Sequence, residues 1–147
     1  MDTGIAGQTS DRGAELDAMS TAPQLREEAV AGSDFVLAEW IDDGATSSAD
    51  RPIAPLHVHD RDDEAWYVLD GTLAFRRGDE LVEAAAGAAV LVPAGVPHSF
   101  WNAASAPARY VIVMTPRIAA LVAAIHEPGA HDDLEGLFHR FDSRLLH

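Results

Sequence analysis

Short runs of apolar or alternating residues, separated by Gly, Asp and Pro, recur at regular spacing through the middle of this chain. Such runs are typical of half-buried strands that turn one face toward a core. The series predicts about eight antiparallel strands that close into a barrel or jelly roll, an all-β fold without a Rossmann unit. The expected strands are 35–41, 55–59, 64–69, 72–77, 81–84, 90–92, 97–102 and 109–115.

Two local patterns in this series concern turns. The tetrapeptide 77–80, Arg-Gly-Asp-Glu, is typical of a tight hairpin turn that joins two neighbouring strands. The Ala-rich segment 83–89 has helix propensity, but it is short and Gly87 interrupts it. We therefore predict the end of a strand and a turn in this segment.

The pattern changes to helical spacing after Thr115. This residue suits a helix N-cap, Pro116 suits the first helical position, and apolar residues then recur every three or four positions up to about His126. A second helix is expected within 131–145, with one apolar face. That face consists of Leu134, Leu137, Phe138 and Phe141. Both helices are expected to pack against the barrel or another subunit.

The 147 residues suffice for one domain and are too few for two full ones. Residues 1–24 are rich in small and polar residues without periodicity, which predicts a mobile N-terminal arm. The expected organisation is an arm at 1–24, a β-barrel at 25–116 and a short C-terminal helical tail at 117–147.

Composition excludes several classes of partner and chemistry. The formal net charge is -14, so nucleic acids and anionic membrane surfaces would be repelled. There is no cysteine, which excludes disulfides and thiolate ligands and leaves only nitrogen or oxygen to bind a metal. No secretory signal or apolar stretch long enough to span a membrane is present, so we expect a cytoplasmic protein.

Three histidines and a glutamate form the candidate functional group. His57 and His59 alternate in an expected strand and therefore point to the same face. Glu64 begins the next strand after an acidic loop, so a carboxylate returns beside the pair, and barrel closure could add His98. Three imidazoles and one carboxylate suit one divalent ion of Mn, Fe, Co, Ni, Cu or Zn better than Ca or Mg.

These residues also resemble the two sequence motifs of the cupin family. The first motif is met by His57, His59 and Glu64, with Gly71 seven positions after the glutamate. The second is matched at every position, by Gly87, Pro93, Gly95, His98 and Asn102. The 15 residues between the motifs, 72–86, are similar to the spacing in compact, single-domain microbial cupins.

One position departs from the first motif. Arg51 occupies the place of the glycine expected six residues before His57, which affects the geometry of a turn and not the ligand set. The resemblance implies a cupin barrel, a metal held by the four residues above, and a homodimer. In the similar quercetinase-type enzymes the glutamate is both ligand and proton acceptor, which would make Glu64 a catalytic residue.

Other residues are weaker candidates. Trp66, Val68 and Phe100 share the inward face of Glu64 and His98 and are expected to line a substrate cavity or fill the core, as is Met114. Acidic residues flank the site, and a charge run in a loop is usually only solvated. These acidic residues are Asp60, Asp62 and Asp63. The four histidines of the C-terminal tail, at 126, 131, 139 and 147, lack a spacing typical of metal ligands.

Three functions follow from this site. The first is a quercetinase-like dioxygenase that acts on a small aromatic or enolisable substrate. The second is a non-redox metal isomerase or cyclase, for which Tyr67 or Tyr110 would have to move a proton. The third is a non-catalytic module that binds a small molecule.

Overall fold

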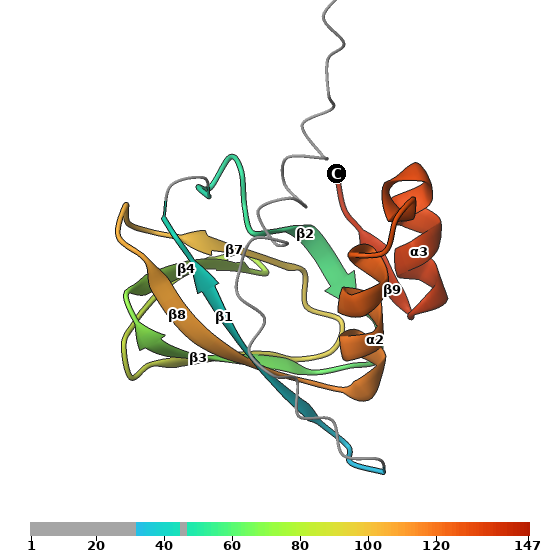
Figure 1. Cartoon of the computed structure of the whole chain (residues 1–147), viewed down its shortest axis with the longest axis horizontal. Coiled ribbons are helices and arrows are strands. Elements are labelled where there is room, and N and C mark those ends of the chain that lie inside the picture. The colour runs from blue at the N-terminus through green and yellow to red at the C-terminus, as the bar shows by residue number, and fades with distance from the viewer. Residues whose placement is uncertain (1–31, 45–46) are drawn as a thin grey trace, which may run out of the picture.

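The computed structural model describes residues 32–44 and 47–147. The predicted arm at 1–24 lies outside these residues. The described part of the chain folds into nine strands, two α-helices and one 3-10 helix (Figure 1). The first eight strands are β1 (Val36–Asp42), β2 (Ala54–His59), β3 (Glu64–Asp70), β4 (Thr72–Arg77), β5 (Glu80–Ala85), β6 (Ala89–Val92), β7 (His98–Asn102) and β8 (Ala108–Met114).

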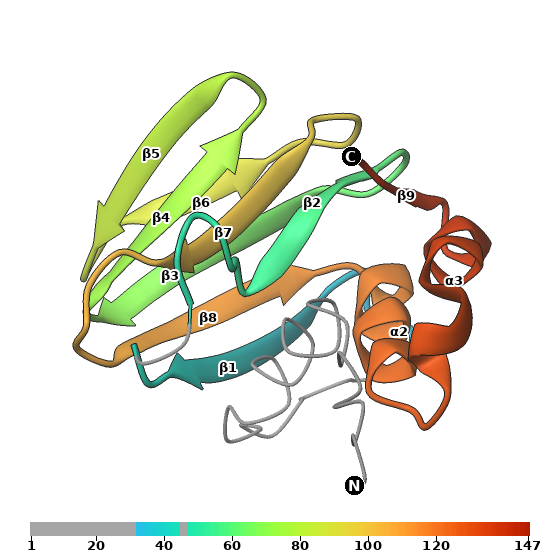
Figure 2. The same ribbon diagram turned by 90° about the horizontal axis from the view of Figure 1, so that it is seen from above.

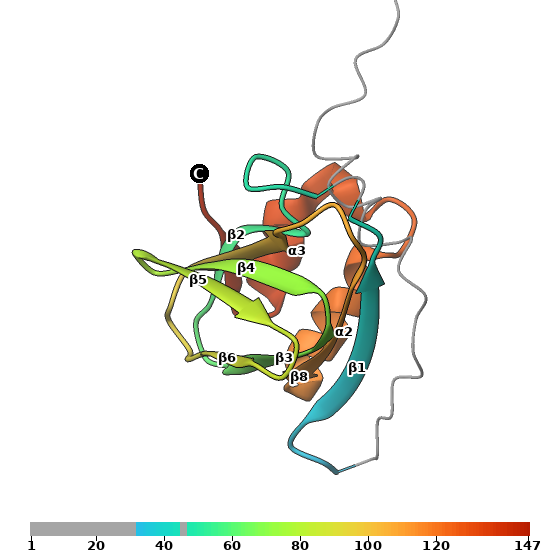
Figure 3. The same ribbon diagram turned by 90° about the vertical axis from the view of Figure 1, so that its left-hand side faces the viewer.

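The strands form two antiparallel sheets that face each other, as the edge-on view of Figure 3 shows. One sheet has the order β1-β8-β3-β6, and the other has the order β5-β4-β7-β2-β9. Each pair of neighbouring strands in the described residues is antiparallel, so the prediction of an all-β fold of antiparallel strands is confirmed.

The alternation of the sequence explains which sheet faces are buried. In both β1 and β8, buried residues alternate with more exposed ones along the whole strand. The inward residues of both sheets form one apolar core that includes Trp66, Phe75, Phe100 and Tyr110. The predicted hairpin is present, since β4 pairs with β5 and Arg77 lies opposite Glu80. The segment after β5 is a turn, as predicted, and not a helix.

The first helix of the C-terminal segment, α2 (Pro116–Ile125), has the predicted beginning. Thr115 is its N-cap, and the Thr115 hydroxyl oxygen accepts a hydrogen bond from the backbone N–H of Ile118 at 3.3 Å. Pro116 stands in the first turn, where its missing N–H costs nothing.

The prediction of a second helix over 131–145 is only partly right. A 3-10 turn, η1 (Ala130–Asp133), leads into the short helix α3 (Leu134–Arg140), and the chain then forms a ninth strand, β9 (Ser143–Leu145). Asp142 has a positive φ of 51°, which ends the helical run and turns the chain toward the sheet.

Helices α2 and α3 lie together at one end of the two sheets (Figure 2). Their apolar faces form a second core. This core contains Leu121, Ile125, Leu134, Leu137 and Phe138. No helix of the described residues is long and apolar enough to cross a membrane.

Candidate metal centre and cavity

The four predicted ligands come from both sheets. His57 and His59 lie on β2, and His57 is paired in register with His98 on the neighbouring strand β7. Glu64 is the first residue of β3, in the facing sheet. The acidic loop 60–63 therefore carries the chain from one sheet to the other, and the glutamate returns opposite the histidines.

Ligand-type atoms of these four residues lie within 4.8 Å of one another, and all four residues are buried. The Nε2 atoms of His57 and His59 are 3.1 Å apart. Glu64 Oε2 lies 3.2 Å from Nε2 of His59 and 3.1 Å from Nε2 of His98. The four side chains thus direct lone-pair-bearing atoms at one small volume.

The Nδ1 atom of each of the three histidines forms a hydrogen bond to a group outside the four candidate ligands. Nδ1 of His57 lies 2.6 Å from the carbonyl oxygen of Pro55, and Nδ1 of His98 lies 3.0 Å from that of Val96. Since a carbonyl can only accept, both Nδ1 atoms carry the proton and donate it. A neutral ring with its proton on Nδ1 offers the Nε2 lone pair to an ion, which would take the place of the hydrogen bonds between Nε2 and Glu64.

Burial and the neighbouring groups keep the ligands in their metal-binding forms. Desolvation, reinforced by the nearby His98 and His59, lowers the pKa of His57 to about 3, so this imidazole is neutral at physiological pH. Desolvation alone would raise the pKa of Glu64, but hydrogen bonds to His59 and His98 outweigh it and lower that pKa to about 2. A neutral imidazole beside a carboxylate is the state that coordinates an ion.

This donor set is compatible with one divalent metal ion. Without a cation, shared protons must satisfy the close contacts between Nε2 atoms and the carboxylate. One ion would satisfy all four ligands at once. Sequence reasoning predicted this group, and the structure brings its four members together.

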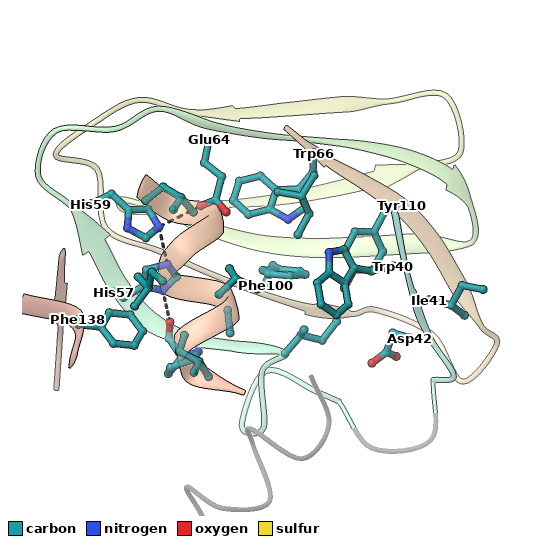
Figure 4. Close-up of a pocket in the computed structure, with 18 residues that line it drawn as sticks. Trp40, Ile41, Asp42, His57, His59, Glu64, Trp66, Phe100, Tyr110 and Phe138 are labelled. Atoms are coloured by element: carbon teal, nitrogen blue, oxygen red, sulfur yellow. Dashed lines mark hydrogen bonds and ion pairs between the residues drawn. The ribbon is translucent and has the colours of Figure 1, made fainter. Parts of the chain in front are cut away.

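A cavity of about 740 Å³, including its open mouth, adjoins the ligand cluster (Figure 4). Its walls are mostly apolar and aromatic, and no Arg stands among the described residues that line it. Three predicted ligands, His57, His59 and Glu64, face the cavity. A bound ion would therefore be accessible to a small molecule.

The predicted lining residues divide into two groups. Trp66 and Phe100 line the cavity, whereas Val68 and Met114 are buried in the core and are not among the described lining residues. Sequence reasoning missed Trp40 on β1 and Phe138 on α3, which also line it. The periodicity of the tail indicated an apolar face, but it carried no signal of which end of the barrel that face would cover.

Two tryptophans of the cavity wall have unpaired donors. The indole Nε1 atoms of Trp40 and Trp66 are buried and make no hydrogen bond to the described residues. A buried N–H without a partner is costly.

The two tyrosines proposed as proton carriers lie in different places. Tyr67 points outward and is 45% exposed, while Tyr110 is buried and lines the cavity. Desolvation, with a smaller contribution from Asp42, raises the pKa of the Tyr110 phenol, so it remains protonated. The aromatic rings of His98, Trp66, Phe100 and Tyr110 follow one another in contact, so Tyr110 lies at some distance from the histidines.

The acidic residues of the loop after β2 make structural contacts. Asp60 pairs with Arg144, and Asp62 accepts a hydrogen bond from the Thr115 hydroxyl at 3.0 Å. Asp63 accepts one from the backbone N–H of Ala94 at 2.8 Å. None of these three residues is among the described residues that line the cavity.

Two facing antiparallel sheets with a buried three-histidine, one-glutamate cluster at one end define a class of small β-barrel with a candidate metal centre. Residues 49–114 match the Cupin_2 family, described as a cupin domain. The match covers most of the two sheets, and a small single-domain cupin fits the structure. No curated protein sequence matches the chain.

Solved structures share the fold. A sugar phosphate isomerase from a cupin superfamily of Silicibacter pomeroyi superposes with a TM-score of 0.57 at 24% identity, over 75% of this chain and 67% of that chain. The TT1209 protein of Thermus thermophilus superposes with a TM-score of 0.52 at 24% identity, over 66% of this chain and 85% of that chain. An uncharacterized protein of Klebsiella pneumoniae with a double-stranded β-helix domain superposes with a TM-score of 0.51 at 19% identity, over 78% of this chain and 91% of that chain. At these identities the likeness shows the fold alone.

Proposed function

We propose that this cupin binds one divalent transition-metal ion through His57, His59, Glu64 and His98, and that it acts as a quercetinase-like oxygenase on a small aromatic or enolisable compound. The observation that carries the proposal is the buried ligand cluster at the wall of an apolar, aromatic cavity. A bound ion would supply a Lewis acid with open positions for an oxygen atom of the substrate and for dioxygen.

In this proposal Glu64 is a ligand and also the proton acceptor. Its carboxylate lines the cavity and lies beside His59 and His98, so the same side chain could contact both the ion and a substrate bound in the cavity.

The cavity also disfavours a phosphorylated substrate. Phosphate groups are usually held by Arg, by Lys or by backbone N–H groups at a helix end. The chain has no Lys, and its described cavity residues include no Arg. We therefore do not extend the sugar phosphate activity named for the Silicibacter pomeroyi protein to this chain.

A metal-dependent isomerase or cyclase is the second candidate, and Tyr110 is the observation that favours it. This phenol lines the cavity and keeps its proton, because burial raises its pKa. It could donate a hydrogen bond or a proton to a substrate that also reaches Glu64. Because Trp66 and Phe100 lie between Tyr110 and the histidines, such a substrate would have to extend along the cavity.

Oxygen uptake by the protein distinguishes these functions. The purified protein is loaded separately with Fe, Mn, Co, Ni, Cu and Zn and is tested in an oxygen electrode with flavonols, catechols and enolisable ketones. The oxygenase predicts uptake with a redox-active metal, reduced by about 100-fold or more in Glu64→Gln, since general bases contribute about 100-fold to 10,000-fold. Tyr110→Phe serves as the matched variant and should retain the uptake.

Other results would redirect the assignment. Isomerisation without oxygen uptake that is lost in Tyr110→Phe would favour the second candidate. Binding of these compounds without turnover in any metal form would favour a non-catalytic binding protein, which is the third hypothesis.

A homodimer and a cytoplasmic location remain part of the proposal. The outer face of the β1-β8-β3-β6 sheet exposes Leu37, Tyr67 and Leu91, which supports contact with a second copy. Light scattering of the purified protein and fractionation of cells that produce it test these two points.

A further inference from the structure

The C-terminal strand β9 extends the sheet that carries the histidines. It lies beside β2 (Figure 2) and pairs antiparallel with it, with Leu145 opposite His57 and Ser143 opposite His59. Sequence reasoning placed these residues in a helix, in which they would not pair with β2. The pairing brings the end of the chain directly beside two of the candidate ligands.

Ser143 holds the outer nitrogen of His59. Its side chain is completely buried, and its Oγ lies 2.7 Å from Nδ1 of His59. The same hydroxyl donates its proton to the carbonyl oxygen of Phe141 at 3.1 Å. Since that proton is used, Oγ accepts from Nδ1–H of His59. This contact fixes the orientation of the His59 ring, with Nε2 directed at Glu64 and His57.

This contact differs from those of the other two histidines. His57 and His98 donate to carbonyl groups only two residues away in the sequence. His59 depends on a hydroxyl that is 84 residues distant in the sequence. Its orientation is therefore coupled to the docking of β9.

Contacts on both sides of Ser143 keep β9 in place. The backbone N–H of Asp60 donates to the carbonyl oxygen of Asp142 at 2.8 Å, and that of Leu146 donates to the carbonyl oxygen of Leu56 at 3.0 Å. On the outer side, Arg144 forms an ion pair with Asp60 at 2.9 Å, which is exposed and therefore adds little to the docking of β9.

We propose that Ser143 is a positioning residue of the metal site, which sets the tautomer and the orientation of His59 and makes the C-terminal strand part of that site. The inference rests on the proposed function, because it assigns Ser143 a role toward the ion that His59 would bind. Hydrogen-bond partners of metal-bound histidines commonly have this effect on the affinity for metal.

Ser143→Ala tests the proposal, with Arg144→Ala as the matched control. Ser143→Ala removes the hydroxyl and little volume, while Arg144→Ala removes an exposed ion pair of the same strand. The dissociation constant for Co²⁺ is measured by competition with a chelator. Ser143→Ala should weaken binding by about tenfold to a hundredfold. Arg144→Ala should change it by less than about fivefold, because exposed ion pairs contribute little.

A second readout needs no metal. In nitrogen-15 spectra of the metal-free protein, the Nδ1 signal of His59 should show its hydrogen bond to the Ser143 hydroxyl, and Ser143→Ala should shift that signal more than the Nδ1 signals of His57 and His98. Unchanged Co²⁺ affinity or an unchanged His59 Nδ1 signal in Ser143→Ala would overturn the proposal, as would an equal loss of affinity in Arg144→Ala. Wild-type protein that binds no Co²⁺ would overturn the proposed metal site as well, which distinguishes the two failures.

Discussion

Gly71 and Gly87, one from each cupin motif, have the same backbone conformation in different surroundings. Both have a positive φ, 78° and 89° respectively. A Cβ at Gly71 would lie 2.5 Å from the carbonyl oxygen of Pro107 and 2.8 Å from Cα of Ala108, both main-chain atoms. A Cβ at Gly87 would meet nothing within 4 Å. Alanine should therefore cost much more stability at Gly71 than at Gly87.

The size of the difference follows from two contributions. A left-handed backbone costs alanine about 1–2 kcal/mol, and the reduced freedom of the unfolded chain returns about 0.4–1 kcal/mol, so Gly87→Ala should lose about 1 kcal/mol. The clash at Gly71 adds an overpacking cost of about 1–3 kcal/mol, which gives about 3 kcal/mol for Gly71→Ala. In a domain of this size these losses lower Tm by about 3 °C and about 9 °C.

Thermal unfolding followed by circular dichroism measures both variants against the wild type. Neither glycine is among the candidate ligands, so each folded variant should also keep the metal content of the wild type. Equal decreases in Tm would refute the reasoning about the Pro107 contact. Loss of metal from folded Gly71→Ala protein would show that this glycine does more than form a turn.

Two further predictions concern Tyr110 and Thr115. In Tyr67→Phe protein, which keeps only Tyr110, the near-ultraviolet phenolate absorbance should not rise as pH passes about 10, because burial raises the pKa of this phenol. Stability should fall as pH rises above that value, since the unfolded chain loses the proton first, and a normal titration in folded protein would contradict the assignment. Thr115→Ala should lose about 2 kcal/mol of unfolding free energy in denaturant titrations, because the hydroxyl caps α2 and donates to Asp62, whereas Thr115→Ser should lose much less.

Side chains alternate between the two faces of a strand, and this alternation, called strand parity, made much of the fold and of the site predictable from sequence. The period of two placed His57 and His59 on one face, and about eight regularly spaced strands predicted an antiparallel barrel or jelly roll. His98 is different, since nothing local relates it to the other ligands. Its resemblance to the second cupin motif, and not periodicity, placed it beside them.

Parity gives the face of a residue but not its depth in the barrel. Trp66 and Val68 share the inward face of β3, yet two positions along a strand correspond to about 7 Å. Trp66 therefore reaches the cavity, while Val68 is fully buried in the packed core. Met114 was expected to line the cavity or to fill the core, and it lies in the core.

The C-terminal end could not be predicted because its pairing is made by the backbone. The apolar spacing that forms α3 continues through Phe141 to Leu145, so it favours a longer helix. The positive φ of Asp142 and the hydrogen bonds of β9 to β2 end that helix instead. No local sequence pattern predicts a strand of three residues whose partner strand lies more than eighty residues earlier.

Metal binding by the four-residue cluster is tested by a comparison of metal content. The proteins compared are the wild type, His98→Ala and His131→Ala. Each protein is stripped with a chelator, loaded with Co²⁺ or Zn²⁺, freed of excess ion and analysed by plasma mass spectrometry, with circular dichroism to establish that it is folded. We expect about one ion per chain in the wild type and in His131→Ala, because His131 is exposed and lies outside the cluster. His98→Ala should lose most of its bound metal. Folded His98→Ala protein that keeps one ion per chain would contradict the assignment of His98 as a ligand.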